Sequence, residues 1–219
     1  SMAISKKLET IYHNGQPDGI RSIRRNLSTM TVYVIPRPLL AEAKTISGIN
    51  RPGIYYLINE NDDNKIAQIY VGQTRNGILR LDDHNRSKDF WNKAIMFLAD
   101  NKTFSLDMIS GLEKFAIIKA QESKRYKVEN TVVPKYEIDE YDMASVEEIY
   151  DEIQFIMGTQ GYKMDNVKSS TSSDIFHTTR NGISALGIYD GEKFQVLEGS
   201  QININKPVHL ARYNKPVSY

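Results

Sequence analysis

The stretch from residue 53 to residue 72 decides the fold. It reads Gly53-Ile54-Tyr55-Tyr56-Leu57-Ile58, then the polar Asn59-Glu60-Asn61-Asp62-Asp63-Asn64, then Ile66-Ala67-Gln68-Ile69-Tyr70-Val71-Gly72. Two runs rich in tyrosine and β-branched residues around an Asn/Asp cluster predict a β-hairpin. A hairpin centred on residues 62 and 63 places Tyr55 opposite Tyr70, and period-2 alternation puts both phenols on one face. Gly72 shares that face and lets another group approach the backbone closely. The opposite face is expected to pack on the core through Ile54, Tyr56, Ile58, Ile69 and Val71.

A predicted helix after the hairpin carries a cation and a histidine. Arg80 and His84 are four residues apart, so on a helix they lie on one side while Ile78 and Leu81 turn elsewhere. Because this helix begins only a few residues after Gly72, we expect it to start beside the tyrosine face.

A second predicted helix spans residues 106–123, with an apolar stripe formed by Leu106, Ile109, Ile117 and Ala120. Glu113 is in phase with this stripe, four residues after Ile109 and four before Ile117. A carboxylate on a buried stripe costs several kcal/mol unless it is paired or binds a metal. Glu113 is therefore predicted either to pair with a buried arginine or to ligate a metal ion.

Gly53-Ile54-Tyr55 and Tyr70-Val71-Gly72 resemble the two strand motifs of the GIY-YIG nucleases, with Val71 where isoleucine is usual. The family pattern continues with an Arg and a His one helical turn apart, a Glu on a later helix, and a closing Asn. The resemblance thus implies a catalytic set of Tyr55, Tyr70, Arg80, His84, Glu113 and Asn130. It also implies an α+β fold with a small three-stranded sheet flanked by helices. Residues 94–98 are either the third strand of that sheet or a continued helix, and periodicity does not decide between them.

The resemblance further implies hydrolysis of phosphodiester bonds in DNA, with RNA not excluded. This chemistry needs an activated water, neutralised charge on the phosphate, and help for the leaving oxygen. Glu113 is the implied ligand of Mg²⁺ or Mn²⁺, which bind through one carboxylate and several waters. Arg80 is expected to hold the phosphate with its fork of donors, and Asn130 to orient a tyrosine or the phosphate.

A tyrosine general base must lose its proton well below the usual tyrosine pKa of about 10. A neighbouring cation (the metal, Arg80 or protonated His84) lowers that pKa by favouring the phenolate. Alternatively, His84 accepts the proton and relays it. The sequence leaves open whether Tyr55 or Tyr70 takes the proton from water.

The predicted nucleic-acid surface comprises Gly72, Arg80, Lys88, Lys93, Lys124, Arg125 and Lys127. Two rival functions remain: a nucleic-acid-binding module that has lost activity, and a nuclease-like scaffold for protein interactions. A further basic cluster, Arg21, Arg24 and Arg25, is either a solvated face or a contact to the phosphate backbone.

The composition of the chain limits the classes of protein to which it can belong. The chain has 219 residues, a formal net charge of +1 and no cysteine. No disulfide or thiolate zinc site is therefore available, and a reducing, cytoplasmic location is expected. No apolar run approaches the roughly 20 residues of a membrane span and no signal peptide is visible, so no membrane partner is expected. With so small a net charge, a nucleic-acid binder must concentrate its basic residues locally.

The chain is predicted to have four parts: a β-rich N-terminal lead-in over 1–50, the nuclease-like domain over 51–132, an acidic helical connector over 133–165, and a small β-rich C-terminal domain over 166–219. The connector helix bears acidic residues on its outward face, so we expect nucleic acid to avoid it. Residues 166–173 read as a linker. Beyond it, the hairpin dipeptides Asn181-Gly182 and Asp190-Gly191 predict a β-meander. This tail resembles a domain of unknown function that accompanies some GIY-YIG proteins.

Overall fold

The computed structural model describes residues 2–60, 66–102 and 104–165, together with the backbone of residues 175–180, 183–189 and 194–196. The chain divides into two compact units, Ser1–Val167 and Lys168–Tyr219. The predicted turn at 61–64, the linker and both hairpin dipeptides lie outside the described residues. The finer division of the chain at residues 50, 132 and 165 stays a prediction.

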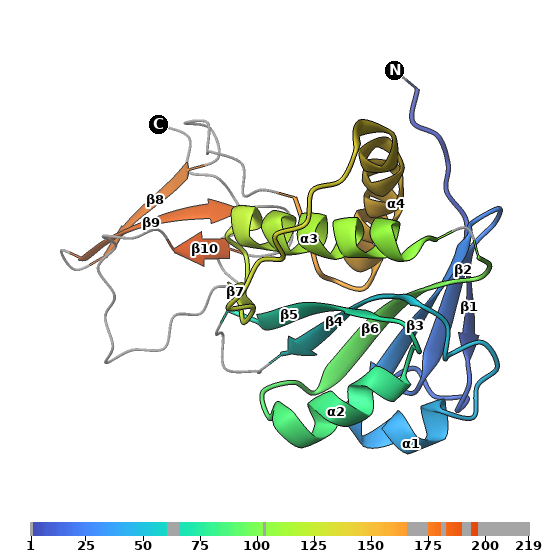
Figure 1. Cartoon of the computed structure of the whole chain (residues 1–219). Helices are drawn as coiled ribbons and strands as arrows, with labels where there is room; N and C mark the ends of the chain where they lie inside the picture. The colour runs from blue at the N-terminus through green and yellow to red at the C-terminus, as the bar shows by residue number, and fades with distance from the viewer. Residues whose placement is uncertain are drawn as a thin grey trace. The chain divides into compact units, whose positions relative to one another are not determined.

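The first unit is built on a seven-stranded sheet with the strand order β1-β2-β3-β6-β4-β5-β7 (Figure 1). Its neighbouring strands are antiparallel except β5 and β7, which run parallel. The strands are β1 (Leu8–Tyr12), β2 (Arg21–Arg25), β3 (Met30–Pro36), β4 (Gly53–Asn59), β5 (Gln68–Thr74), β6 (Lys93–Ala99) and β7 (Lys127–Val128).

The predicted α+β class is confirmed, and residues 94–98 belong to strand β6, which pairs with β4. The sheet has seven strands where we expected three, because β3 pairs with the other side of β6 and β2 and β1 follow it. Strand β3 is buried from Met30 to Ile35. A strand that is buried along almost its whole length has cover on both faces, which suits an interior position in a sheet.

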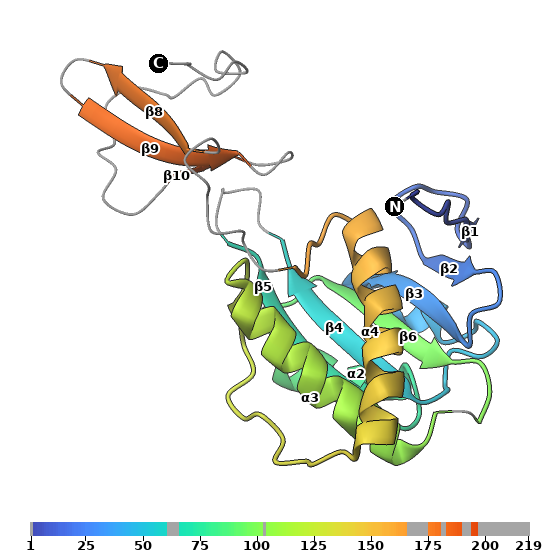
Figure 2. The same cartoon turned by 90° about the horizontal axis from the view of Figure 1, so that it is seen from above.

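Helices cover both faces of this sheet (Figures 1 and 2). They are α1 (Leu40–Ala43), α2 (Leu79–Ser87), α3 (Leu106–Ser123) and α4 (Glu140–Thr159). One core lies between the sheet and α3 and α4, and it contains Ile54, Tyr56, Ile58, Ile69 and Val71, as predicted. A second core lies on the tyrosine face under α1 and α2. The expectation of a single buried face was therefore wrong, since Tyr55 is only 1% exposed.

The register of the central hairpin differs from the predicted one by two residues. Tyr55 pairs with Gly72, and Tyr70 pairs with Leu57. The two tyrosines are thus diagonal neighbours instead of a direct pair. Because the shift is an even number of residues, both phenols still leave the sheet on one face. The observed register lays the Tyr55 ring over Gly72, where a Cβ atom would stand 2.3 Å from the Tyr55 hydroxyl oxygen.

Helix α3 has the predicted bounds, and Ser105 caps it by accepting a hydrogen bond from the Met108 N–H. Ile109, Ile117 and Ala120 are buried as expected, but Leu106 is exposed because it lies in the first turn of the helix. Glu113 is half-buried at the margin of the stripe.

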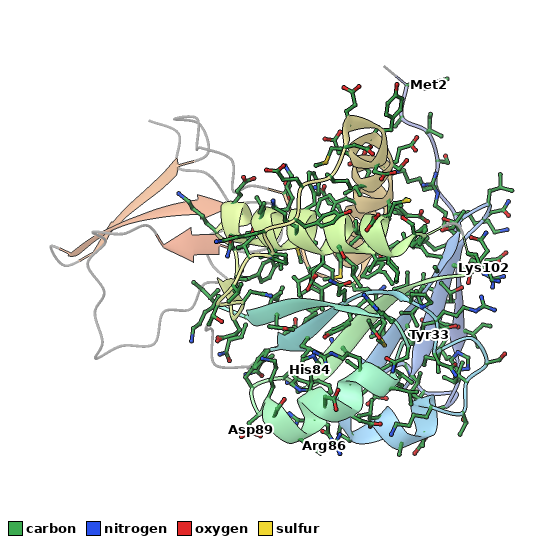
Figure 3. The ribbon with its side chains drawn as sticks, viewed as in Figure 1. Met2, Tyr33, His84, Arg86, Asp89 and Lys102 are labelled. Atoms are coloured by element: carbon green, nitrogen blue, oxygen red, sulfur yellow. The ribbon has the colours of Figure 1, made fainter. Side chains whose placement is uncertain are left out.

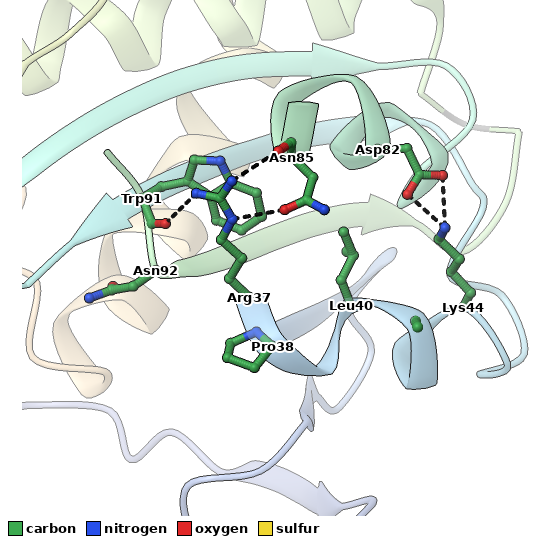
Figure 4. Close-up of a pocket in the computed structure, with 9 residues that line it drawn as sticks. Arg37, Pro38, Leu40, Lys44, Asp82, Asn85, Trp91 and Asn92 are labelled. Carbon is green, nitrogen blue, oxygen red and sulfur yellow. Dashed lines mark hydrogen bonds and ion pairs between the residues drawn. The ribbon is translucent and has the colours of Figure 1, made fainter. Parts of the chain in front are cut away.

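Arg37 anchors the helix that carries Arg80 and His84 (Figure 4). Its guanidinium donates hydrogen bonds to the side chain and the carbonyl oxygen of Asn85 and to the Trp91 carbonyl oxygen, and it lies 4.5 Å from the Trp91 ring centroid. Because Asn85 lies in the last turn of α2, the cation also favours the negative end of the helix dipole. A hollow of about 500 Å³ lies beside these residues.

The second unit contains a three-stranded antiparallel sheet with the strand order β10-β9-β8. Its strands are β8 (Ile175–Arg180), β9 (Ile183–Tyr189) and β10 (Phe194–Val196). Consecutive strands are neighbours, so the predicted β-meander is confirmed for the backbone described.

Candidate active site

A tyrosine–histidine pair forms the floor of the candidate site. The Tyr55 hydroxyl oxygen lies 2.6 Å from Nε2 of His84. The imidazole of His84 also contacts the Tyr70 ring, with centroids 5.4 Å apart. Strand β4 supplies Tyr55 and β5 supplies Tyr70. Helix α2 carries His84 on the side of the helix that faces the sheet (Figure 3). The expected convergence of these three side chains is therefore present.

His84 is a neutral base at pH 7. Burial, followed by the positive charges of Arg80 and Lys88, lowers the pKa of His84 from 6.5 to about 4. Nδ1 of the same ring is buried without a hydrogen-bond partner among the described residues. A protonated His84 is thus not available to stabilise a phenolate, whereas a neutral His84 can accept a proton from Tyr55.

Arg80 lies on the exposed side of α2 and acts on Tyr55 both by its charge and by a hydrogen bond. Both effects lower the pKa of Tyr55, as expected from the sequence. Burial outweighs them, so the pKa values of Tyr55 and Tyr70 are both raised above 10.0. Neither tyrosine is a preformed phenolate in the free protein at neutral pH.

Glu113 reaches the site from α3, and its negative charge raises the pKa of both tyrosines. Its Oε2 accepts a hydrogen bond of 2.6 Å from the Gln73 side-chain amide. Burial raises the pKa of the Glu113 carboxyl, while the hydrogen bonds from Gln73 and the charge of Arg80 oppose this rise. The partner of this carboxylate is thus a neutral amide, and Glu113 makes no salt bridge to arginine within the described part of the chain.

The carboxylate of Glu113 fits a magnesium or manganese ion. Oε2 is held by Gln73, and no hydrogen bond to Oε1 is found in residues 2–60, 66–102 and 104–165. The same residues contain no cluster of three or more His, Cys, Asp or Glu side chains that suits a metal. A single carboxylate completed by water suits Mg²⁺, which retains several of its waters in proteins.

Asn130 lies at the outer edge of β5 and clamps one residue of the second motif. Its Oδ1 accepts a hydrogen bond of 2.9 Å from the Val71 N–H, and its Nδ2 donates one of 2.8 Å to the Val71 carbonyl oxygen. This contact holds the strand between Tyr70 and Gly72. The group that approaches the backbone of Gly72 closely is the Tyr55 side chain, which fills the space above this glycine.

The predicted basic residues fall into two groups. Arg80 and Lys88 adjoin the tyrosines, with Nζ of Lys88 lying 4.3 Å from the Tyr70 ring centroid. Three of the others bind acidic or tyrosine side chains elsewhere: Lys93 contacts Glu60 and Tyr162, Arg125 contacts Asp165, and Lys127 contacts Glu129. Lys124 follows α3 and has a left-handed backbone conformation. Their binding of nucleic acid stays a prediction.

Residues 51–137 match the family model of the GIY-YIG catalytic domain. GIY-YIG domains are nuclease domains and generally depend on a divalent metal ion. Searches of curated proteins and of solved structures found no match. No helix in the described part of the chain is long and apolar enough to cross a membrane.

The buried histidine predicts an acid-sensitive fold. The pKa of His84 is about 4 in the folded state and near 6.5 when unfolded. The unfolded chain therefore binds the extra proton first, so the contribution of His84 is complete above pH 6.5 and is lost as the pH falls towards 4. We expect wild type to lose about 3 kcal/mol more unfolding free energy over this window than His84→Gln. Urea unfolding at several pH values measures this difference, and parallel curves for the two proteins would contradict it.

Proposed function

We propose that this chain is a metal-dependent endonuclease that hydrolyses DNA phosphodiester bonds by direct attack of water, with a tyrosine as the general base. The observation that carries the proposal is the 2.6 Å contact between the Tyr55 hydroxyl and neutral His84. Arg80 and Glu113 both act electrostatically on the same phenol. The proposed catalytic set is Tyr55, Tyr70, Arg80, His84, Glu113 and Asn130.

Tyr55 is the favoured base because Nε2 of His84 can accept the proton of its hydroxyl group. The attacking water gives a proton to the Tyr55 oxygen while the Tyr55 hydroxyl gives its proton to Nε2 of His84. The water becomes the nucleophilic hydroxide, and the positive charge ends on His84. A concerted relay of this kind avoids a free phenolate, which burial of Tyr55 disfavours. The negative charge of the bound phosphate must offset the burial and the cations that disfavour a protonated His84. Tyr70 has a half-exposed ring beside His84 and is the alternative base.

Arg80 and Glu113 serve the phosphate. Arg80 is exposed at the rim and presents its donors to a non-bridging phosphate oxygen. Glu113 would hold Mg²⁺ or Mn²⁺ through Oε1. A divalent ion there neutralises charge on the phosphate and lowers the pKa of a nearby water. Asn130 keeps the second motif in place through the Val71 backbone.

The DNA is proposed to approach from the side of Arg80 and Lys88, with the more distant cations Lys93, Lys124, Arg125 and Lys127 as additional phosphate contacts. A cytoplasmic location, which fits a chain without cysteine, is part of the same proposal.

Nicking of supercoiled plasmid tests the function. Wild type is expected to convert the plasmid to open circles with Mg²⁺ or Mn²⁺ and to stop when EDTA is added. Glu113→Ala should be at least 100-fold slower, because the metal lowers the barrier by several kcal/mol, while the protein remains folded. A folded wild type without nicking under any of these conditions would favour an inactive binding module or an interaction scaffold. Nicking by Glu113→Ala at the wild-type rate would remove this residue from the site.

A further inference from the structure

We propose that Gln73, which no motif marks, is a positioning residue that fixes the Glu113 carboxylate at the outer edge of β5 and leaves one oxygen free for the divalent ion. The inference deepens the proposed function and rests on it. Gln73 follows Gly72 directly and lies on the face of the sheet covered by α3, opposite to the tyrosines.

The edge of β5 supplies the first argument. Residues 69, 71 and 73 lie along this edge, and each is bonded to a different partner. The Ile69 carbonyl oxygen accepts from the Glu129 N–H, and the Val71 backbone is clamped by Asn130. At Gln73 the side-chain amide finds the partner, because its Nε2 donates to Oε2 of Glu113. Glu113 is thus tied to an edge strand through one residue.

The orientation of the Gln73 amide supplies the second argument. A carboxylate only accepts hydrogen bonds, so the NH₂ group of Gln73 must face Glu113. The amide oxygen then faces the Ser110 hydroxyl, which lies 3.4 Å away and one turn before Glu113 on α3. Ser110 donates in this arrangement. The flipped amide would place two acceptors in contact, so the network specifies one orientation.

The consequence for the carboxylate is geometric. With Oε2 held at 2.6 Å by Gln73, rotation of the Glu113 carboxyl group is restricted and Oε1 is the oxygen that remains to bind a metal. Hydrogen-bond partners of ligating carboxylates typically change metal affinity or activity by about 10–100-fold when removed. Gln73 is therefore expected to set the affinity for the ion, while Glu113 itself makes the bond.

The chain offers a matched control on the same strand. Gln68 also donates to a glutamate, with its Nε2 at 2.7 Å from Oε1 of Glu129. Glu129 is outside the proposed metal site. Gln68→Leu thus removes an equivalent hydrogen bond from β5 without touching Glu113. Gln73→Leu and Gln73→Met both remove the donor, and the second variant retains the length of the side chain.

The experiment titrates Mn²⁺ alone into the full chain and measures the free ion by its electron paramagnetic resonance signal. Gln73→Leu and Gln73→Met are expected to bind Mn²⁺ about 10-fold more weakly than wild type or worse, and Gln68→Leu to bind as wild type does. In plasmid nicking, the half-saturating Mn²⁺ concentration should rise by the same factor, whereas the rate at saturating Mn²⁺ should fall by less.

Three outcomes would overturn the inference: wild-type Mn²⁺ affinity in both Gln73 variants, an equal loss in Gln68→Leu, or no Mn²⁺ binding by wild type. If Glu113→Ala loses Mn²⁺ binding and nicking while the Gln73 variants do not, Gln73 has no positioning role and the proposed function stands. If Glu113→Ala keeps both, the proposed function itself fails.

Discussion

Tyr55→Phe is expected to nick plasmid about 1000-fold more slowly than wild type, within the range for removal of a positioned general base. The substitution deletes only the hydroxyl, so the ring continues to fill the space over Gly72. The water then has no group to receive its proton, and Nε2 of His84 loses its 2.6 Å partner. The lost hydrogen bond should also lower the unfolding free energy by about 1 kcal/mol, which a melting curve measures independently.

The adjacent Tyr56→Phe is the matched control. Tyr56 is buried in the opposite core, and its hydroxyl has no hydrogen-bond partner among the described residues. Its removal should leave nicking unchanged and stability equal or slightly higher, because an unpaired buried hydroxyl is costly. If Tyr55→Phe keeps the wild-type rate and Tyr70→Phe loses it, the base is Tyr70. Equal losses of nicking rate in Tyr55→Phe and Tyr56→Phe would mean that the Tyr55 hydroxyl does not act as the general base.

Gly53→Ala is expected to lower the unfolding free energy by about 3 kcal/mol or more, the upper range for overpacking in a core. A Cβ atom at Gly53 would stand 2.0 Å from the Phe97 carbonyl oxygen and 2.9 Å from the Leu98 Cα. Both are backbone atoms of β6, so neither can move without separating β4 from its neighbour. Urea unfolding followed by circular dichroism measures the loss.

Gly158→Ala provides the opposite case. Gly158 lies near the end of α4, and a Cβ atom there would meet nothing within 4 Å. Alanine in a helix is favoured over glycine by about 0.5–1 kcal/mol, so this variant should be more stable than wild type.

A Gly53→Ala protein as stable as wild type would contradict the prediction for Gly53, because it would mean that β4 and β6 are further apart at this position than in the structure.

Much of the site could be predicted because it depends on periodicity. Tyr55 and Tyr70 share a face for any even register, so their placement is insensitive to where the turn lies. The spacing of Arg80 and His84 and the apolar stripe around Glu113 are likewise local properties of helices. The ordered motifs therefore indicated the resemblance to the GIY-YIG nucleases before any long-range contact was known.

The remaining features depend on contacts between distant segments. To predict the hairpin register, one would have to know that the Tyr55 ring occupies the space above Gly72. To predict the second core, one would have to know that α1 and α2 cover the tyrosine face. Burial decides the pKa values of Tyr55 and Tyr70, and burial cannot be deduced from neighbouring charges alone. Gln73 carries no signal in a single sequence, since a polar residue at the end of a strand is unremarkable.

The Asn130 amide contributes a donor and an acceptor in the geometry of a peptide group, so it acts as one residue of an additional strand. An edge strand with free N–H and C=O groups is a template for pairing with another chain. At β5 that template is occupied first by β7 and then by Asn130. At the other end of the sheet, no described residue pairs with the outer side of β1. Intermolecular strand addition, and with it aggregation or domain exchange, therefore has access to this sheet through β1, where Lys7 and Glu9 place charges against it.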